Sequence, residues 1–252
     1  MTIHPDAAQG FSAGADAYDR GRPSYPAAAV DHVVTALGIG SGRRVLDLGA
    51  GTGKFTELLV PTGAALVAVE PVAEMRAKLA AARPDMEVLD GTGEALPLGD
   101  ASVDAVTVAQ AFHWFDPAAA LAEIARVLRP EGGLALLWNA RDESVPWVAE
   151  FTRVIDWHHF QQGHYRAQDW AAVVAGSSNR FTPVEHATFA YEQRLDRAGF
   201  VDRVASISYI AAMAPGDRDA VIAKALAVVE GFPEEFVLPY TTEVWTCRLR
   251  SK

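Results

Sequence analysis

The chain has 252 residues and a net charge of −10 at neutral pH, with 50% hydrophobic and 21% charged residues. This balance is typical of a globular protein with a sizeable core, and the acidity disfavours nucleic acid as a partner because its phosphates would be repelled. No apolar run reaches the roughly 18 residues of a membrane span, and the first residues lack signal-peptide features. We therefore expect a cytoplasmic protein with no membrane partner. The single cysteine, Cys247, allows neither an internal disulfide nor a cysteine-based zinc site.

The first 40 residues predict helices, with a proline-containing break in YDRGRPSYP (residues 18–26). From residue 43, short apolar runs alternate with amphipathic segments, which predicts strands alternating with helices. The predicted strands are residues 45–48, 65–69, 86–89, 103–109 and 134–138. Residues 54–59 predict the start of one helix. Two further helices are predicted over residues 72–82 and 117–128.

This alternation indicates βαβ units and a Rossmann-like, doubly wound α/β sheet of mostly parallel strands. The rhythm ends after Arg141. Residues 142–180 predict helices over the carboxyl edge of the sheet, and residues 183–195 and 237–250 predict two long strands that close the sheet as an antiparallel pair.

The first predicted strand runs into a glycine-rich turn in RVLDLGAGTGKFTELL (residues 44–59). A phosphate-binding P-loop needs one more residue between its glycines and Ser or Thr after the lysine, but here Phe55 follows Lys54. The dinucleotide fingerprint needs its third glycine one place later than Gly53. Neither phosphate pattern fits this turn.

Two acidic residues indicate another ligand. Asp47 precedes the turn, where it would repel a pyrophosphate but suit an ammonium group. Glu70 ends the second strand about 20 residues after the turn, where a carboxylate can accept hydrogen bonds from ribose hydroxyls. A ribose at one end, a cation at the other and no phosphate between them is the pattern of S-adenosylmethionine.

At these residues the sequence resembles the class I S-adenosylmethionine-dependent methyltransferases. The matching segments are VLDLGAGTGKFT (45–56), VAVEPVAEM (67–75), GTGEALPLGDASVDAVTVAQAFHWFD (91–116) and ALAEIARVLRPEGGLALLW (120–138). The segments ADAYDRGRPSYP (15–26) and FVDRVASISY (200–209) resemble the small-molecule branch that includes trans-aconitate and quinone-biosynthesis methyltransferases. The resemblance implies about seven strands with an antiparallel last strand. It also implies a single domain, with a helical lid (1–40), a cofactor-binding core (41–140), and a substrate-side insertion with closing strands (141–252).

The resemblance also implies roles for individual residues. Gly49, Ala50 and Gly51 would contact the methionine part of the cofactor, Glu70 the ribose, and Pro71 and Met75 the adenine. Thr92 stands where family members often carry an acidic residue for the adenine amino group, so Gly93 and Glu94 would contribute backbone contacts. The implied cofactor-binding residues are Tyr18, Arg22, Asp47, Gly49, Ala50, Gly51, Glu70, Pro71, Met75, Thr92, Gly93, Glu94 and Gln110.

Acceptor chemistry is expected after the fourth strand and at the arginines. His113 is a candidate general base, or it orients a substrate oxygen, while Trp114 and Phe115 are expected to shape a pocket or to hold the edge of the adenine. Tyr18 and Arg22 are expected in a lid, and Arg141 at the substrate side. The histidines of WHHFQQGHYR (157–166) lack a carboxylate at a metal-binding spacing, so we expect an aromatic wall and no metal there.

The sequence thus predicts methyl transfer from S-adenosylmethionine to a small-molecule oxygen nucleophile, a carboxylate or a phenol or enol, leaving S-adenosylhomocysteine. The protein is expected as a monomer or homodimer. A cofactor-binding protein without transferase activity, such as a sensor or accessory subunit, is the first alternative. A nicotinamide-dependent dehydrogenase is the second, although the glycine spacing and Asp47 disfavour it.

Overall fold

The computed structural model describes residues 20–156, 170–176 and 180–251. Within these residues the strands form one seven-stranded sheet with the order β3-β2-β1-β4-β5-β7-β6. The strands are β1 (Arg44–Leu48), β2 (Ala65–Val69), β3 (Glu87–Leu89), β4 (Val103–Ala109), β5 (Leu128–Arg141), β6 (Glu185–Leu195) and β7 (Phe236–Arg248).

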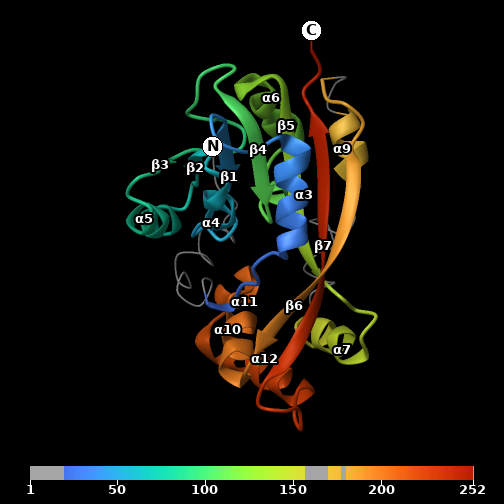
Figure 1. The fold of residues 1–252 in the computed structure, drawn as a ribbon. Coiled ribbons are helices and arrows are strands. Elements are labelled where there is room, and N and C mark those ends of the chain that lie inside the picture. Colours follow the sequence, from blue (N-terminus) through green and yellow to red (C-terminus); the bar gives the residue numbers. More distant parts are fainter. Residues whose placement is uncertain (1–19, 157–169, 177–179, 252) are drawn as a thin grey trace. The chain divides into compact units, whose positions relative to one another are not determined.

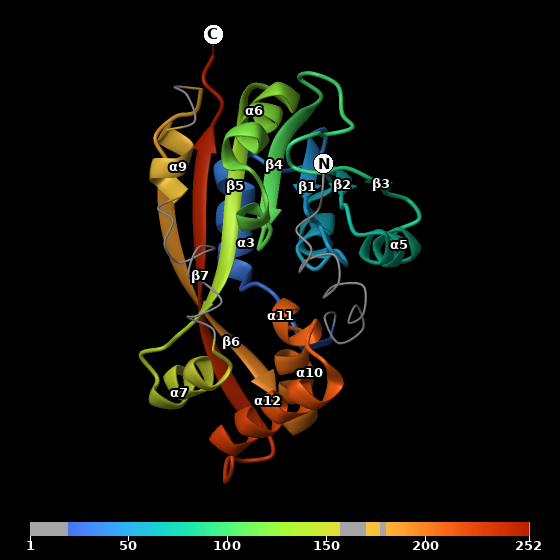
Figure 2. The same cartoon turned by 180° about the vertical axis from the view of Figure 1, so that it is seen from behind.

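The first five strands are parallel, as their alternation with helices predicts. β7 runs opposite to β5 and β6 (Figures 1 and 2), so the antiparallel closing pair and the Rossmann-like fold class are confirmed. The strand order reverses at β1, which pairs with β2 on one side and β4 on the other. Ligands of open α/β sheets bind outside the carboxyl ends of the strands at such a point.

By their contacts, the described residues form two compact units, each with its own core. One, the sheet unit, comprises residues 25–139, 170–176, 180–189 and 242–251. The other, the helical unit, comprises residues 20–24, 140–156 and 190–241. The expected division into lid, core and insertion stays a prediction.

Helices cover both faces of the sheet in the sheet unit. They are α3 (Ala27–Leu37), α4 (Thr56–Leu59), η1 (Val60–Thr62), α5 (Ala73–Ala82), η2 (Phe112–Trp114), α6 (Pro117–Val127) and α9 (Trp170–Gly176). α3 lies on one face and α6 on the other (Figures 1 and 2). The fully buried Val33 of α3 packs in one cluster with Val45 of β1 and Leu137 of β5, which fixes this helix on the sheet.

The helical unit contains α7 (Pro146–Val154), α10 (Arg197–Ala205), α11 (Ser208–Ala211) and α12 (Pro215–Val228), together with the adjoining parts of β6 and β7. Its core joins Phe151, Phe200, Ile210 and Leu238, all fully buried. α10, α11 and α12 lie in a part of the chain for which the sequence pattern gave no helix prediction. No described helix is long and apolar enough to cross a membrane.

Candidate functional site

The glycine turn after β1 is closed by its own hydrogen bonds. The amides of Gly49 and Ala50 donate to the carbonyl of Val69 at 2.8 and 3.3 Å, and the amide of Gly53 donates to the carbonyl of Ala50. Gly49, Gly51 and Gly53 have φ values of 70°, 59° and 92°, a region that favours glycine. A phosphate cradle needs backbone amides directed at the ligand, but these amides already have partners within the protein.

Two buried carboxylates lie against this turn. Glu70 is 5% exposed and accepts hydrogen bonds from the amides of Gly51 and Val72 at 2.8 and 2.9 Å. Asp47 is 2% exposed and accepts hydrogen bonds from the hydroxyls of Thr56 and Thr107 at 2.5 and 3.0 Å.

Burial dominates the electrostatics of both groups. It raises the pKa of Asp47 to about 6, against the opposing effect of the two threonine hydroxyls. Burial also raises the pKa of Glu70, and the charge of Asp47 adds to that effect while the backbone amides and Arg76 oppose it. Two coupled carboxylates under a glycine turn favour cationic or hydroxyl groups over phosphate.

Glu70, Pro71 and Met75 belong to the corner between β2 and α5. Arg76 closes this corner, because its Nη1 donates to the carbonyls of Glu70 and Pro71 and forms an ion pair with Asp90 at 3.1 Å. Met75 is 3% exposed on the inner side of α5. The roles of Pro71 and Met75 at adenine stay predictions.

The loop that carries Thr92, Gly93 and Glu94 packs closely against Phe115. A Cβ placed on Gly93 would lie 2.7 Å from the Phe115 ring, and the same ring lies 3.6 Å from a Cβ placed on Gly49. The hydroxyl oxygen of Thr92 is buried and has no hydrogen-bond partner within the described part of the chain. The carboxylate of Glu94 accepts from the amide of Asp116 at 2.8 Å, which ties the loop to the start of α6.

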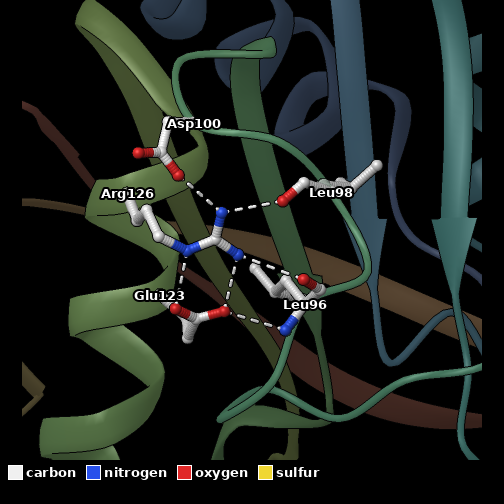
Figure 3. Close-up of polar contacts among 5 residues, drawn as sticks. All are labelled: Leu96, Leu98, Asp100, Glu123 and Arg126. Atoms are coloured by element: carbon white, nitrogen blue, oxygen red, sulfur yellow. Dashed lines mark hydrogen bonds and ion pairs between the residues drawn. The ribbon is translucent and has the colours of Figure 1, made fainter.

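Arg126 of α6 holds the remainder of this loop (Figure 3). Its guanidinium donates to the carbonyls of Leu96 and Leu98 at 3.1 and 2.7 Å and pairs with Asp100 and Glu123. Glu123 also accepts from the amide of Leu96 at 2.9 Å. The loop is therefore fixed to the scaffold at both ends.

The end of β4 places Gln110 in the left-handed region, with φ of 61°. A non-glycine residue in this conformation is strained, and such strain concentrates at functional sites. The Nε2 atom of Gln110 lies 3.5 Å from the carbonyl of Asn139, at the outer limit of a hydrogen bond. His113 and Trp114 follow in η2, both partly buried, with ring centroids 4.6 Å apart.

The two arginines expected in the lid and around the acceptor lie outside the sheet unit. Tyr18 and the histidine-rich segment 157–166 lie outside the described residues. Arg22 and Arg141 both belong to the helical unit, where Arg22 donates to the carbonyl of Ser206 at 2.9 Å and Arg141 to the hydroxyl of Thr152 at 3.1 Å. The structure thus groups these two arginines with each other, and the roles expected for them stay predictions.

Sequence reasoning missed the partners of the acidic residues. The hydroxyls of Thr56 and Thr107 donate hydrogen bonds to Asp47, but in the sequence each threonine looks like an ordinary helix or strand residue. Arg126 lies inside a matched segment but was given no role. The sequence signal for this role is a single arginine in the last turn of α6, which follows a loop rich in glycine and proline.

Comparison with known proteins identifies the family of the chain. A family profile described as "Methyltransferase domain" matches residues 46–136, from β1 to β5. An uncharacterized methyltransferase of Mycobacterium tuberculosis is 46% identical over 204 residues, which is 81% of this chain and 79% of that protein. The chain belongs to the class I S-adenosylmethionine-dependent methyltransferases.

Two further likenesses are more limited. A malonyl-[acyl-carrier protein] O-methyltransferase of Methylococcus capsulatus is 46% identical over 99 residues, 36% of each chain. The crystal structure of the [4+2]-cyclase SpnF superposes with a TM-score of 0.57 at 18% identity and covers 92% of this chain and 85% of that one. Because the likeness to the cyclase shows the fold alone, the reaction of this methyltransferase has to be argued from its residues.

Several features of the sheet unit fit the cofactor of this methyltransferase family. Each oxygen of Glu70 has one backbone donor, and a carboxylate oxygen can accept a second hydrogen bond, which leaves capacity for a donor such as a ribose hydroxyl. The buried hydroxyl of Thr92, which has no hydrogen-bond partner among the described residues, could make a polar contact at the place expected for adenine. The carboxylate of Asp47 beneath the turn favours a cationic group.

Proposed function

We propose that this methyltransferase binds S-adenosylmethionine at the carboxyl ends of β1, β2 and β4 and methylates an oxygen atom of a small-molecule acceptor. The observation that carries the cofactor part is the glycine turn itself. The amides of its three glycines and of Ala50 have partners within the protein and two buried carboxylates lie against it, which suits hydroxyl and ammonium groups and disfavours phosphate.

The proposed contacts follow the expected positions. The backbone from Gly49 to Gly51 would hold the methionine part, Glu70 the ribose, and residues 92–94 the adenine. Gln110, held in its strained conformation, would present its backbone or side chain to the amino group. When bound, S-adenosylmethionine supplies a methyl group activated by a positively charged sulfur, so the protein has to align the acceptor and exclude water.

The chemistry of the acceptor decides whether a base is needed. A carboxylate acceptor is already a nucleophile and needs only orientation, for which Arg141 and Trp114 are candidates. A phenol must lose its proton, and His113 is then the proposed base, because a neutral imidazole can accept a proton near pH 7. The name of the O-methyltransferase relative supports oxygen as the acceptor atom.

The first experiment is calorimetric titration of the full-length protein with S-adenosylmethionine and S-adenosylhomocysteine, comparing wild type with Glu70→Gln. Glutamine keeps the size of the side chain and one acceptor oxygen, whereas alanine would leave the amides of Gly51 and Val72 without their partner. We expect binding to the wild type and at least about 10-fold weaker binding to Glu70→Gln, because hydrogen bonds to a charged acceptor contribute about 1.5–3 kcal/mol.

Glu57→Gln is the matched control, because Glu57 is an exposed carboxylate of the same unit that pairs with Arg83. It should bind both ligands like the wild type. Absence of wild-type binding would overturn the cofactor assignment. Binding without turnover of carboxylic acids, phenols or enols would overturn the oxygen acceptor and favour a binding role without transfer.

A further inference from the structure

The carboxylate of Asp47 is held by two threonines from different elements of the sheet unit. Thr107 lies directly opposite Asp47 where β4 pairs with β1, and Thr56 is the first residue of α4. Their hydroxyls donate to different oxygens of the carboxylate, Thr56 to Oδ2 at 2.5 Å and Thr107 to Oδ1 at 3.0 Å. Both threonines are fully buried. The carboxylate is therefore fixed at both of its oxygens beneath the glycine turn.

Packing alone does not require a hydroxyl at either position, because valine has nearly the same shape as threonine. A buried hydroxyl is unfavourable unless it makes a hydrogen bond, and here both hydroxyls make theirs to the same carboxylate. Burial disfavours the charged form of Asp47, whereas the hydroxyls of Thr56 and Thr107 favour it. The two threonines thus oppose the effect of burial on this one group.

The hydroxyl of Thr107 has a second acceptor within reach. It lies 3.0 Å from Oδ1 of Asp47 and 3.4 Å from the carbonyl oxygen of Leu46. A hydroxyl donates one hydrogen and can also accept one. Thr107 can therefore donate to ionised Asp47, or accept from protonated Asp47 while it donates to Leu46. The hydrogen bond of the Thr56 hydroxyl goes to Asp47 within the described part of the chain, so Thr56 favours the ionised form more strongly.

Other charged groups surround this carboxylate. The charged or titratable residues on the elements packed around it are Tyr25 before α3, Asp31 and His32 in α3, Lys54 in the turn, Glu57 in α4, Glu70 after β2 and Asp104 in β4. Among them, the charge of Glu70 is coupled to that of Asp47, and Arg76 of α5 offsets part of the effect. The charge beneath the turn therefore depends on whether Asp47 is ionised.

We propose that Thr56 and Thr107 are positioning residues for the cofactor, which hold Asp47 ionised beneath the turn so that its negative charge attracts the ammonium group of S-adenosylmethionine. The proposal rests on the cofactor binding proposed above. The two threonines act through Asp47 and not by touching the ligand. Affinity for the cofactor should then fall as acid protonates Asp47, and the loss of either hydroxyl should move this fall to higher pH.

The test has two readouts. The first is the pKa of Asp47 in the free full-length protein, measured by NMR of labelled aspartate carboxyl carbons, with Asp47→Asn to assign the signal. The second is calorimetric titration at several pH values with S-adenosylmethionine, S-adenosylhomocysteine and methylthioadenosine, which has the nucleoside part but no ammonium group.

The variants are Thr56→Val and Thr107→Val, together with Thr56→Ser and Thr107→Ser, which keep the hydroxyl. Thr62→Val is the matched control, because the hydroxyl of this half-buried threonine of the same unit donates to the carbonyl of Leu59 at 2.6 Å.

We expect Thr56→Val to lower the acid dissociation constant of Asp47 about 10-fold, as loss of a hydrogen bond to a charged group does, and Thr107→Val to lower it less. S-adenosylmethionine and S-adenosylhomocysteine should then bind to Thr56→Val about 5-fold more weakly than to wild type near pH 6, and almost equally near pH 8, because only the ionised fraction binds well. Methylthioadenosine should bind wild type and variants alike at each pH. The serine variants and Thr62→Val should keep the wild-type pH profile.

An unchanged pKa of Asp47 in the valine variants would overturn the proposal without any ligand. Weaker binding that is the same at both pH values, or that extends to methylthioadenosine, would show a merely structural role and would also overturn it. If Thr56→Val does not fold, judged by circular dichroism, Thr107→Val decides by the same criteria. Failure of the wild type to bind all three ligands would instead overturn the proposed function, and the NMR titration would still show whether the hydroxyls control the charge of Asp47.

Discussion

At the scale of single residues, Asp47 combines burial with a titratable charge. Its carboxylate has two threonine hydroxyls as partners, yet burial raises its pKa from 3.8 to about 6. The folded protein therefore holds the Asp47 proton more tightly than the unfolded chain does. The stability contributed by the protonated form is fully present below pH 3.8 and is lost as the pH rises through about 6.

We predict that Asp47→Asn removes this loss. A shift from 3.8 to about 6 corresponds to about 3 kcal/mol, so the variant should gain about that much relative to wild type between pH 4 and pH 8. Urea unfolding at a series of pH values measures the difference. Asp31→Asn, at an exposed position on α3, is the control. A difference between Asp47→Asn and wild type that does not change with pH would contradict the prediction.

Gly49 is a second residue whose local geometry predicts the effect of a substitution on stability. Its φ is 70°, and a Cβ would lie 2.5 Å from the Cβ of Ala111. We predict that Gly49→Ala lowers the free energy of unfolding by about 2–5 kcal/mol, the sum of backbone strain and overpacking, and also weakens S-adenosylhomocysteine binding.

Gly42→Ala separates these two causes. Gly42 has a similar φ of 81°, but nothing lies within 4 Å of its Cβ position. This variant should therefore lose about 1–2 kcal/mol from strain alone and bind S-adenosylhomocysteine normally. Equal losses in the two variants, measured by urea unfolding, would show that the contact with Ala111 does not matter.

At the scale of elements, the arginine of α6 fixes a loop that is expected to contact adenine (Figure 3). We predict that Arg126→Met lowers stability by about 1–3 kcal/mol, because charged hydrogen bonds to Glu123 and Asp100 and to two carbonyls are lost. S-adenosylhomocysteine affinity should fall several-fold because residues 92–94 would no longer be held in one conformation.

Arg83→Met provides the comparison. Arg83 pairs with the half-exposed carboxylate of Glu57 and contacts no part of this loop by that pair. Exposed ion pairs contribute only about 0–1 kcal/mol, so this variant should bind like wild type in calorimetry. Unchanged affinity in a destabilised Arg126→Met would show that the loop keeps its conformation without the arginine.

The elements also show how far the sequence could be interpreted. β2 and β4 begin and end at the predicted residues, because continuous apolar runs bounded by turns leave little choice for strands buried on both faces. β5 is longer than predicted at both ends, because it begins at Leu128, where its register against β4 shifts around the exposed Arg129, Pro130 and Glu131, and it continues to Arg141. α12 was missed because its apolar residues are spread around the helix, so periodicity gives no clear face.

The site shows the same division. The structure brings the turn, Asp47 and Glu70 together, as their spacing along the chain predicts, and their roles toward the cofactor stay predictions. The contacts of Arg126 with the carbonyls of Leu96 and Leu98 depend on the packing of α6 against the loop, and no local pattern encodes that.

At the scale of the whole molecule, the described chain has two cores, one in each unit. We predict that ligands protect the two units separately in hydrogen exchange. S-adenosylhomocysteine should slow exchange in residues 49–53 and 91–94 of the sheet unit. Exchange in α10, α11 and α12 of the helical unit should change little. Equal protection of α12 by S-adenosylhomocysteine would show that both units open together.

A pair of stacked tryptophans in the sheet unit should be detectable by circular dichroism. The indole rings of Trp138 and Trp170 are stacked, with centroids 4.7 Å apart and planes 3° from parallel, and Trp170 also meets Phe112 edge-on at 5.3 Å. Two indoles so close couple their electronic transitions, so this pair should give a distinctive near-ultraviolet circular dichroism band. Because Trp170 begins α9 and Trp138 lies in β5, the band would report the docking of that helix without any label.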